Sequence, residues 1–101
     1  MSKKRSVEET KAYQQIVESE PYCQLCGSTY YLQIHHIFYR SELGLTTPKN
    51  LIRLCARCHR LVHSNKAYWQ PLLLEKQYKK YGKFEDIEIC KRFEFYKEVN
   101  L

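Results

Sequence analysis

Apolar positions near the start of the chain recur with helical spacing. Between residues 7 and 19 they return every three to four positions, which predicts one helix. Ser6 and Glu9 have the spacing of a capping box at its beginning, and Pro21 follows its end. We expect this helix to cover the hydrophobic core.

Residues that favour β-structure then predict two strands, over residues 30–37 and 50–54. Residues 38–49 between them contain glycine and proline and predict a long loop. Such loops are often functional. Residues 56–65 predict a helix, so the expected order is strand, loop, strand and helix.

The segment 66–101 has a helical pattern. Its apolar stripe predicts one helix with Pro71 in the first turn and Gly82 just after the end. A second helix is predicted from about Glu85 to Val99. Both helices are expected to pack on the strand–loop–strand–helix unit and to enlarge its core.

Length and charge narrow the class of protein. The 101 residues are enough for a single domain, and a formal charge of +6 with a pI near 9.1 favours a polyanionic partner. Residues 1–6 are interpreted as a loose basic arm, because no apolar segment follows them as in a signal peptide. No apolar run approaches the ~18 residues of a membrane span. We therefore expect a cytoplasmic protein without membrane contact.

Two groups of basic residues are candidates for contacts with phosphates. Arg40 lies in the predicted loop, and four lysines lie near the end of the first C-terminal helix: Lys76, Lys79, Lys80 and Lys83. The lysine cluster can be a solvated helix face or a nucleic-acid contact, and the sequence favours neither interpretation.

Four of the five cysteines form two Cys-x-x-Cys pairs. Cys23 and Cys26 precede the first strand, and Cys55 and Cys58 lie at the turn from the second strand to the helix. In a reducing compartment, two such pairs are typical of a closed tetrahedral zinc site. Redox-active or merely buried pairs are the alternative. Cys90 lies far away in an apolar context and is interpreted as a core thiol.

All four histidines fall between His35 and His63. His59 and His63 are four positions apart on the predicted helix, so their side chains share one face. His35 and His36 belong to the first strand, where neighbouring side chains point to opposite faces. Both can serve one site only if the strand ends or bends there.

Residues 22–64 resemble the HNH endonucleases, a family with a ββα-metal (His-Me finger) fold. The family pattern is a His or Asp before a catalytic His, then an Asn, a metal ligand and often a further His. These positions are filled here by His35, His36, Asn50, His59 and His63, at intervals of 14, nine and four after His36. The cysteines are similar to those of the zinc-stapled branch. The resemblance implies a small α+β domain in which an N-terminal helix and C-terminal helices flank a hairpin–helix core with a structural zinc on four cysteines.

The resemblance also implies a one-metal hydrolysis of phosphodiester bonds in DNA. His36 would be the general base, and Asn50 would hold the loop and orient His36. His35 and His59 would hold a divalent cation such as Mg²⁺, Mn²⁺, Ni²⁺ or Zn²⁺, with His63 as a third ligand or a phosphate contact. The zinc held by the four thiolates would be structural only.

A non-catalytic zinc-ribbon module that binds nucleic acid is the alternative function. The complete set of histidines favours the nuclease, because a binding module needs only the cysteines. The resemblance further suggests a setting on a phage or mobile element, and a possible partner in a phage packaging or restriction assembly.

Overall fold

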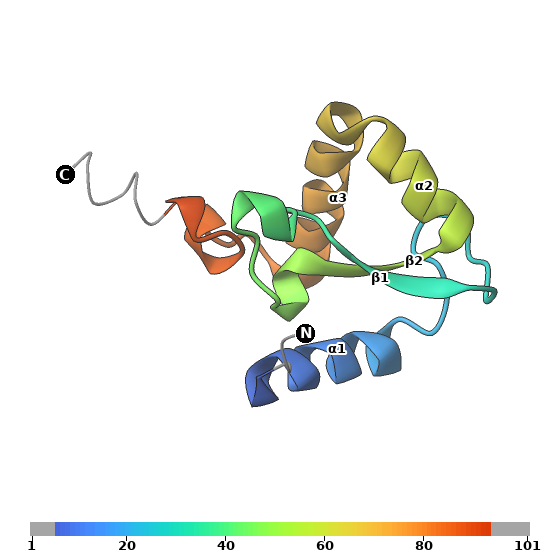
Figure 1. Ribbon diagram of the computed structural model, residues 1–101, viewed down its shortest axis with the longest axis horizontal. Coiled ribbons are helices and arrows are strands. Elements are labelled where there is room, and N and C mark those ends of the chain that lie inside the picture. The colour runs from blue at the N-terminus through green and yellow to red at the C-terminus, as the bar shows by residue number, and fades with distance from the viewer. Residues whose placement is uncertain (1–5, 94–101) are drawn as a thin grey trace.

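A two-stranded antiparallel sheet lies between helices in the computed structural model, which describes residues 6–93 (Figure 1). The helices and strands follow one another as α1 (Val7–Ser19), β1 (Leu32–His36), β2 (Leu51–Cys55), α2 (Ala56–Ser64) and α3 (Lys66–Tyr81). Short 3-10 helices lie at Arg40–Glu42, Pro48–Asn50 and Asp86–Glu88. The fold is the expected small α+β type, and β1, β2 and α2 form a ββα unit consistent with the ββα-metal fold.

Helix α1 covers one face of the sheet and has the bounds that the sequence predicts (Figure 1). The capping box is present: the Glu9 N–H donates to the Ser6 hydroxyl at 3.1 Å, and the Ser6 N–H donates to the Glu9 carboxylate at 3.3 Å. Ala12 and Ile16 are buried against Leu51 of β2. The middle of the apolar stripe thus packs on the sheet, while Val7 and Val17 of the same stripe stay exposed.

The opposite face of the sheet packs against α2 and α3 (Figure 1). The strands align Leu32 with Cys55 and His36 with Leu51. Because side chains alternate along a strand, Ile52 and Leu54 point away from α1 and pack with Val62 and Leu73. Burying each of these apolar side chains contributes about 1.5–3 kcal/mol.

The loop between the strands is folded tightly on itself. The Gly44 N–H donates to the Tyr39 carbonyl at 2.9 Å. A Cβ atom at Gly44 would lie only 1.8 Å from the Phe38 carbonyl oxygen, so no other residue fits there without moving the loop. This packing fixes the path of the loop beside the end of β1.

Two local predictions were wrong near element ends. Strand β1 begins at Leu32 rather than residue 30, because Tyr31 has φ 49° and cannot continue a strand. Pro71 lies inside α3 instead of in its first turn. The reason is that α3 starts immediately after Asn65, whose non-helical backbone (φ −149°, ψ 72°) separates α3 from α2.

The predicted second C-terminal helix does not begin at Glu85. A 3-10 turn is followed by an isolated bridge between Gly44 and Cys90. The Leu45 N–H donates to the Ile89 carbonyl at 2.8 Å, so this backbone pairs with the loop rather than with the next helical turn. Arg92 and Phe93 are helical, and the rest of the predicted helix and most of the predicted basic arm lie outside the described residues.

Cys90 is fully buried, as expected of a core thiol, and lies in a cluster with Phe38, Phe84 and Ile89. Among residues 6–93 no helix has the length and apolar character needed to cross a bilayer.

Candidate active site and metal centres

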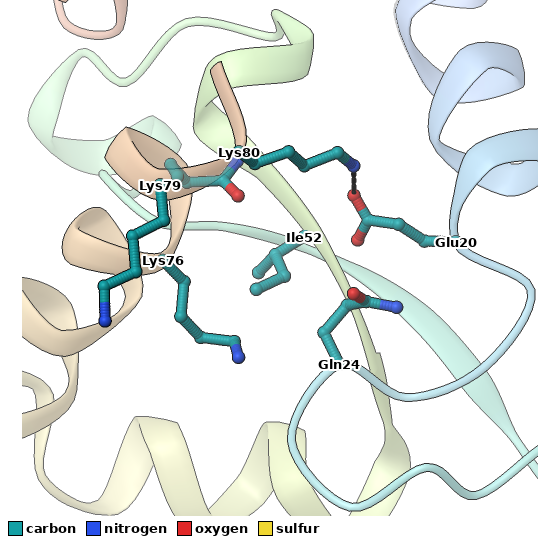
Figure 2. A pocket seen from close by; sticks show the side chains of 7 residues that line it. Glu20, Gln24, Ile52, Lys76, Lys79 and Lys80 are labelled. Carbon is teal, nitrogen blue, oxygen red and sulfur yellow. Dashed lines mark hydrogen bonds and ion pairs between the residues drawn. The ribbon is translucent and has the colours of Figure 1, made fainter. Parts of the chain in front are cut away.

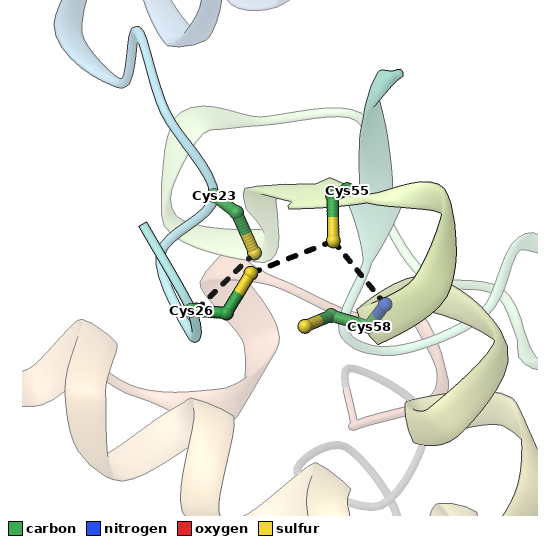
Figure 3. A group of neighbouring side chains, drawn as sticks. All are labelled: Cys23, Cys26, Cys55 and Cys58. Carbon is green, nitrogen blue, oxygen red and sulfur yellow. Dashed lines mark hydrogen bonds between the residues drawn. The ribbon is translucent and has the colours of Figure 1, made fainter. Parts of the chain in front are cut away.

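The four cysteines of the two pairs meet in one cluster (Figure 3). Their Sγ atoms all lie within 4.8 Å of one another, and those of Cys26 and Cys55 are 3.6 Å apart. Zinc–sulfur bonds of about 2.3 Å in a tetrahedron place sulfurs about 3.8 Å apart. The spacing therefore fits a closed four-thiolate zinc site and is far too long for disulfide bonds.

Backbone N–H groups turn toward the sulfurs in both pairs. The Cys26 N–H donates to Cys23 Sγ at 3.5 Å, and the Cys58 N–H donates to Cys55 Sγ at 3.4 Å. Burial raises the pKa of Cys23, but hydrogen bonds from backbone N–H groups outweigh it and bring the pKa to about 6. Burial and the neighbouring sulfurs raise the pKa of Cys58. A bound cation would supply the charge that lets the remaining thiols ionise.

A second cluster consists of His35 from β1 and His59 and His63 from α2. One ring nitrogen of each lies within 4.8 Å of the other two, and the Nε2 atoms of His59 and His63 are 3.0 Å apart. Metal–nitrogen bonds of about 2.1 Å place two ligands of one ion about 3.0–3.4 Å apart. The donor set and its spacing therefore fit a divalent cation with coordination positions left open.

Neighbouring side chains fix the orientation of these imidazoles. The Gln33 amide oxygen hydrogen-bonds Nδ1 of His59, and because that oxygen only accepts, Nδ1 carries the proton. The lone pair on Nε2 of His59 is then free for a metal. The Tyr39 ring packs against the rings of His35 and His63, with centroids 5.7 and 4.8 Å away.

Electrostatics keep His35 and His59 in the neutral form that a metal requires. Burial lowers the pKa of His35 to about 3, and the charges of His59, His63 and His36 act in the same direction. Burial likewise lowers the pKa of His59, with a further contribution from His63. Neutral imidazoles at pH 7 offer lone pairs, so a divalent cation need not displace protons from these two rings.

His36 lies beside this cluster but on the other face of the strand. Its Nε2 is 3.0 Å from the Thr46 hydroxyl, and its ring centroid is 6.1 Å from that of Tyr13. Burial, and then the charge of Arg40, lower the pKa of His36 to about 4. Strand β1 ends at His36, and the rings of His35 and His36 line the same surface depression of about 230 Å³ together with His59 and His63.

Asn50 is fully buried at the end of the loop. Its Oδ1 accepts the Phe38 N–H at 2.8 Å, and its Nδ2 donates to the carbonyls of Phe38 and Leu45 at 3.0 and 2.8 Å. The amide thus ties together both ends of the loop that follows His36. Its side-chain bonds go to the loop backbone and not to the ring of His36.

Arg40 lies at the rim of the histidine depression. Its side chain is 66% exposed and pairs with Glu9 at 3.5 Å. A guanidinium in this position can reach a phosphate that approaches the histidines, because an exposed ion pair contributes little stability and exchanges easily.

The predicted lysine cluster borders a different depression of about 340 Å³ (Figure 2). Lys80 reaches across it to the buried Glu20 carboxylate at 2.6 Å, and Lys79 pairs with Glu75 at 3.7 Å. Glu20 also accepts the Arg53 N–H at 2.9 Å, so it joins the end of α1 to β2 and α3. Two of the four lysines are therefore paired with carboxylates, and only the Lys80 pair reaches a buried partner. This depression shares no lining residue with the histidine depression.

Three side chains at the site were not predicted from the sequence. Gln33 lies two positions before His35 on the same strand, and alternation alone would have placed both on one face. Tyr39 and Thr46 carried no comparable signal, because their contacts depend on the path of the loop.

The part of the chain that carries both clusters is similar in sequence to known proteins. Residues 23–65 match the family model described as HNH endonuclease. The type IV methyl-directed restriction enzyme EcoKMcrA of Escherichia coli (strain K12) is 33% identical over 58 residues. The match covers 48% of this chain and 21% of the relative, so the chain spans about a fifth of the length of the relative that it matches. The matched family segment contains both the cysteine and the histidine clusters.

Proposed function

We propose that the chain is a metal-dependent endonuclease that hydrolyses phosphodiester bonds in DNA, starting from the match of residues 23–65 to the HNH endonuclease family model. One observation carries the proposal: nitrogen atoms of His35, His59 and His63 lie within 4.8 Å of one another in a depression that His36 also lines. A module that only binds nucleic acid needs the cysteines but not this convergence of imidazoles.

The three clustered imidazoles would hold the catalytic cation, with Nε2 of His59 and His63 as two of the donors. Gln33 keeps the proton of His59 on the opposite ring nitrogen. A divalent cation held there would stabilise the negative charge that develops on the scissile phosphate and on the departing oxygen.

His36 would act as the general base. Its low pKa leaves the ring neutral at pH 7, so one ring nitrogen can accept a proton from the attacking water. Asn50 would serve as a positioning residue, because its three bonds hold the loop against the end of β1. Arg40 would exchange Glu9 for a substrate phosphate at the rim.

The four cysteines would hold a structural zinc ion. Their cluster joins the segment before β1 to the start of α2, which carries His59 and His63. A closed tetrathiolate leaves no position for substrate, so the contribution of this metal is to hold the hairpin and helix together.

DNA is the proposed substrate for two reasons. The matched relative is by name a methyl-directed restriction enzyme, and the formal charge of +6 favours a polyanion. Only about a fifth of that relative is matched, so methyl-directed recognition is not transferred to this chain. A cytoplasmic location and an assembly partner in packaging or restriction are further proposals.

Plasmid cleavage tests the function. Supercoiled plasmid incubated with the zinc-loaded protein and Mg²⁺, Mn²⁺, Ni²⁺ or Zn²⁺ should be nicked or linearised, and EDTA should stop the reaction. His36→Ala should abolish cleavage while His63→Ala should weaken the metal response. An intact plasmid with every metal, together with retained DNA binding, would favour the zinc-ribbon binding module instead.

A further inference from the structure

The ring of His36 has a side-chain partner that the sequence pattern does not reveal. Its Nε2 lies 3.0 Å from the hydroxyl oxygen of Thr46, in the loop between the strands. The Gly44 turn and the Asn50 bonds hold that loop in place. The contact is therefore a built feature of the loop and not a chance approach of two surface side chains.

The hydroxyl of Thr46 lies near a carboxylate of α1, because Thr46 and Glu9 line the same depression. The Glu9 carboxylate has its pKa lowered first by the Ser6 N–H and further by a hydrogen bond from Thr46, so it is an ionised acceptor at neutral pH. A carboxylate without a proton can only accept, and a hydroxyl has a single proton to donate. If that proton goes to Glu9, the oxygen of Thr46 must accept from His36.

We propose that Thr46 and Glu9 are positioning residues that hold His36 with its proton on Nε2 and the lone pair of Nδ1 free to accept a proton from water. The chain of hydrogen bonds runs from His36 Nε2–H to the Thr46 oxygen and from the Thr46 hydroxyl to the Glu9 carboxylate. This inference rests on the proposed function for its catalytic meaning, but the tautomer itself is a property of the protein without substrate.

Glu9 is fixed independently of His36. It forms the capping box with Ser6 and pairs with Arg40 at 3.5 Å. It belongs to α1, which precedes the matched HNH segment at residues 23–65. Helix α1 would therefore take a direct part in the site. His36 belongs to the matched segment, and Glu9 of α1 would set which nitrogen of the His36 ring carries the proton.

Nitrogen NMR reads the tautomer directly. Long-range ¹H–¹⁵N correlations of the ¹⁵N-labelled full chain at neutral pH, with zinc in the cysteine cluster and no other metal, should show His36 as the neutral Nε2–H form. Thr46→Val keeps the shape of the side chain but removes the hydroxyl, so the signals should move toward a mixture of tautomers. Thr46→Ser restores the hydroxyl and should restore the wild-type pattern.

Cleavage rates provide the second measurement. Thr46→Val should lower kcat about tenfold, which is less than the loss expected when a general base is removed. KM should change little. Thr46→Ser should recover most of the lost kcat. Glu9→Ala should behave as Thr46→Val does. Ser6→Ala is the matched control, because it breaks the capping box but leaves the carboxylate of Glu9 next to Thr46.

The outcomes separate this inference from the proposed function. A wild-type His36 with its proton on Nδ1, or a Thr46→Val variant with unchanged tautomer and kcat, overturns the inference even when the protein cuts DNA. An Nε2–H tautomer that Thr46→Val disturbs supports it even when no plasmid is cut, in which case the proposed nuclease fails instead. An equal loss of kcat in Ser6→Ala and Glu9→Ala assigns the effect to the helix cap and removes Glu9 from the proposal.

Discussion

The Nε2 atoms of His59 and His63 lie 3.0 Å apart on successive turns of α2. If both atoms bind one cation, removing either imidazole removes a direct ligand. His63→Ala should then weaken binding of a divalent cation by at least the roughly 10–100-fold that loss of an outer hydrogen-bond partner costs. Calorimetric titration with Ni²⁺ or Zn²⁺, after the cysteine site is filled, measures this.

Arg60→Ala supplies the comparison for that titration. Arg60 is on the same helix and exposed, and it belongs to neither metal-ligand cluster. Its loss should leave the affinity unchanged. Equal affinities for wild type and His63→Ala would show that His63 is not a ligand of this cation.

Asn50→Ala should destabilise the protein by about 3 kcal/mol. The amide makes three hydrogen bonds to the loop backbone, and its loss leaves the Phe38 N–H and two carbonyls without these partners. Urea unfolding should show the decrease. Asn65→Ala, an exposed change at the α2–α3 junction, should alter stability far less; comparable losses in the two variants would contradict the anchoring role.

Zinc content should depend on four of the five cysteines. Cys58→Ser should lower bound zinc from about one per chain to near zero and unfold the hairpin–helix region, because a site of this kind contributes about 10–16 kcal/mol. Cys90→Ser should keep its zinc, since Cys90 lies in a separate apolar cluster. Metal analysis and circular dichroism on the purified variants test both statements.

Stability should fall as the solution is acidified below about pH 6.5. The pKa values of His35 and His36 are about 3 and 4 in the folded protein, against an ordinary value of 6.5. Below pH 6.5 the unfolded chain therefore binds protons at these two histidines while the folded chain does not. The stabilisation that this difference gives the folded state is complete above pH 6.5 and is lost toward pH 3–4.

Urea unfolding midpoints measured between about pH 7 and about pH 5.5 give the change of stability with pH, in protein whose histidine site is metal-free. For the buried His35 the expected loss is about 1 kcal/mol per pH unit. His36→Gln should flatten the profile because one of the two groups is gone. A wild-type midpoint that does not change with pH in this range would be inconsistent with the burial of these rings.

Local signals account for the elements that were predicted well. The capping box and Pro21 bound α1, and Gly82, with φ 78°, follows the end of α3. The segment 85–91 was mistaken for part of a helix because its apolar spacing is helical. Its backbone instead pairs with the loop at Leu43 and Leu45, a contact between distant parts of the chain that no local pattern encodes.

Local pattern and long-range contact also differ in what they predict at the site. The spacing of the cysteines, and for the histidines the resemblance to the HNH endonucleases, predicted the two clusters that the structure brings together. The contact between Thr46 and His36 could not be predicted, since it depends on how Asn50 and Gly44 close the loop. The roles assigned to the individual histidines and to Asn50 stay predictions until the variants are measured.

The sulfur of Cys55 makes two kinds of contact. It belongs to the thiol cluster, and as the N-cap of α2 it accepts the Cys58 N–H. Oxidation of this single atom would release the metal and fray the first turn of the helix that presents His59 and His63. The proposed nuclease would then lose its activity under oxidative stress with every imidazole chemically unharmed, and thiol reductants with fresh zinc would restore it.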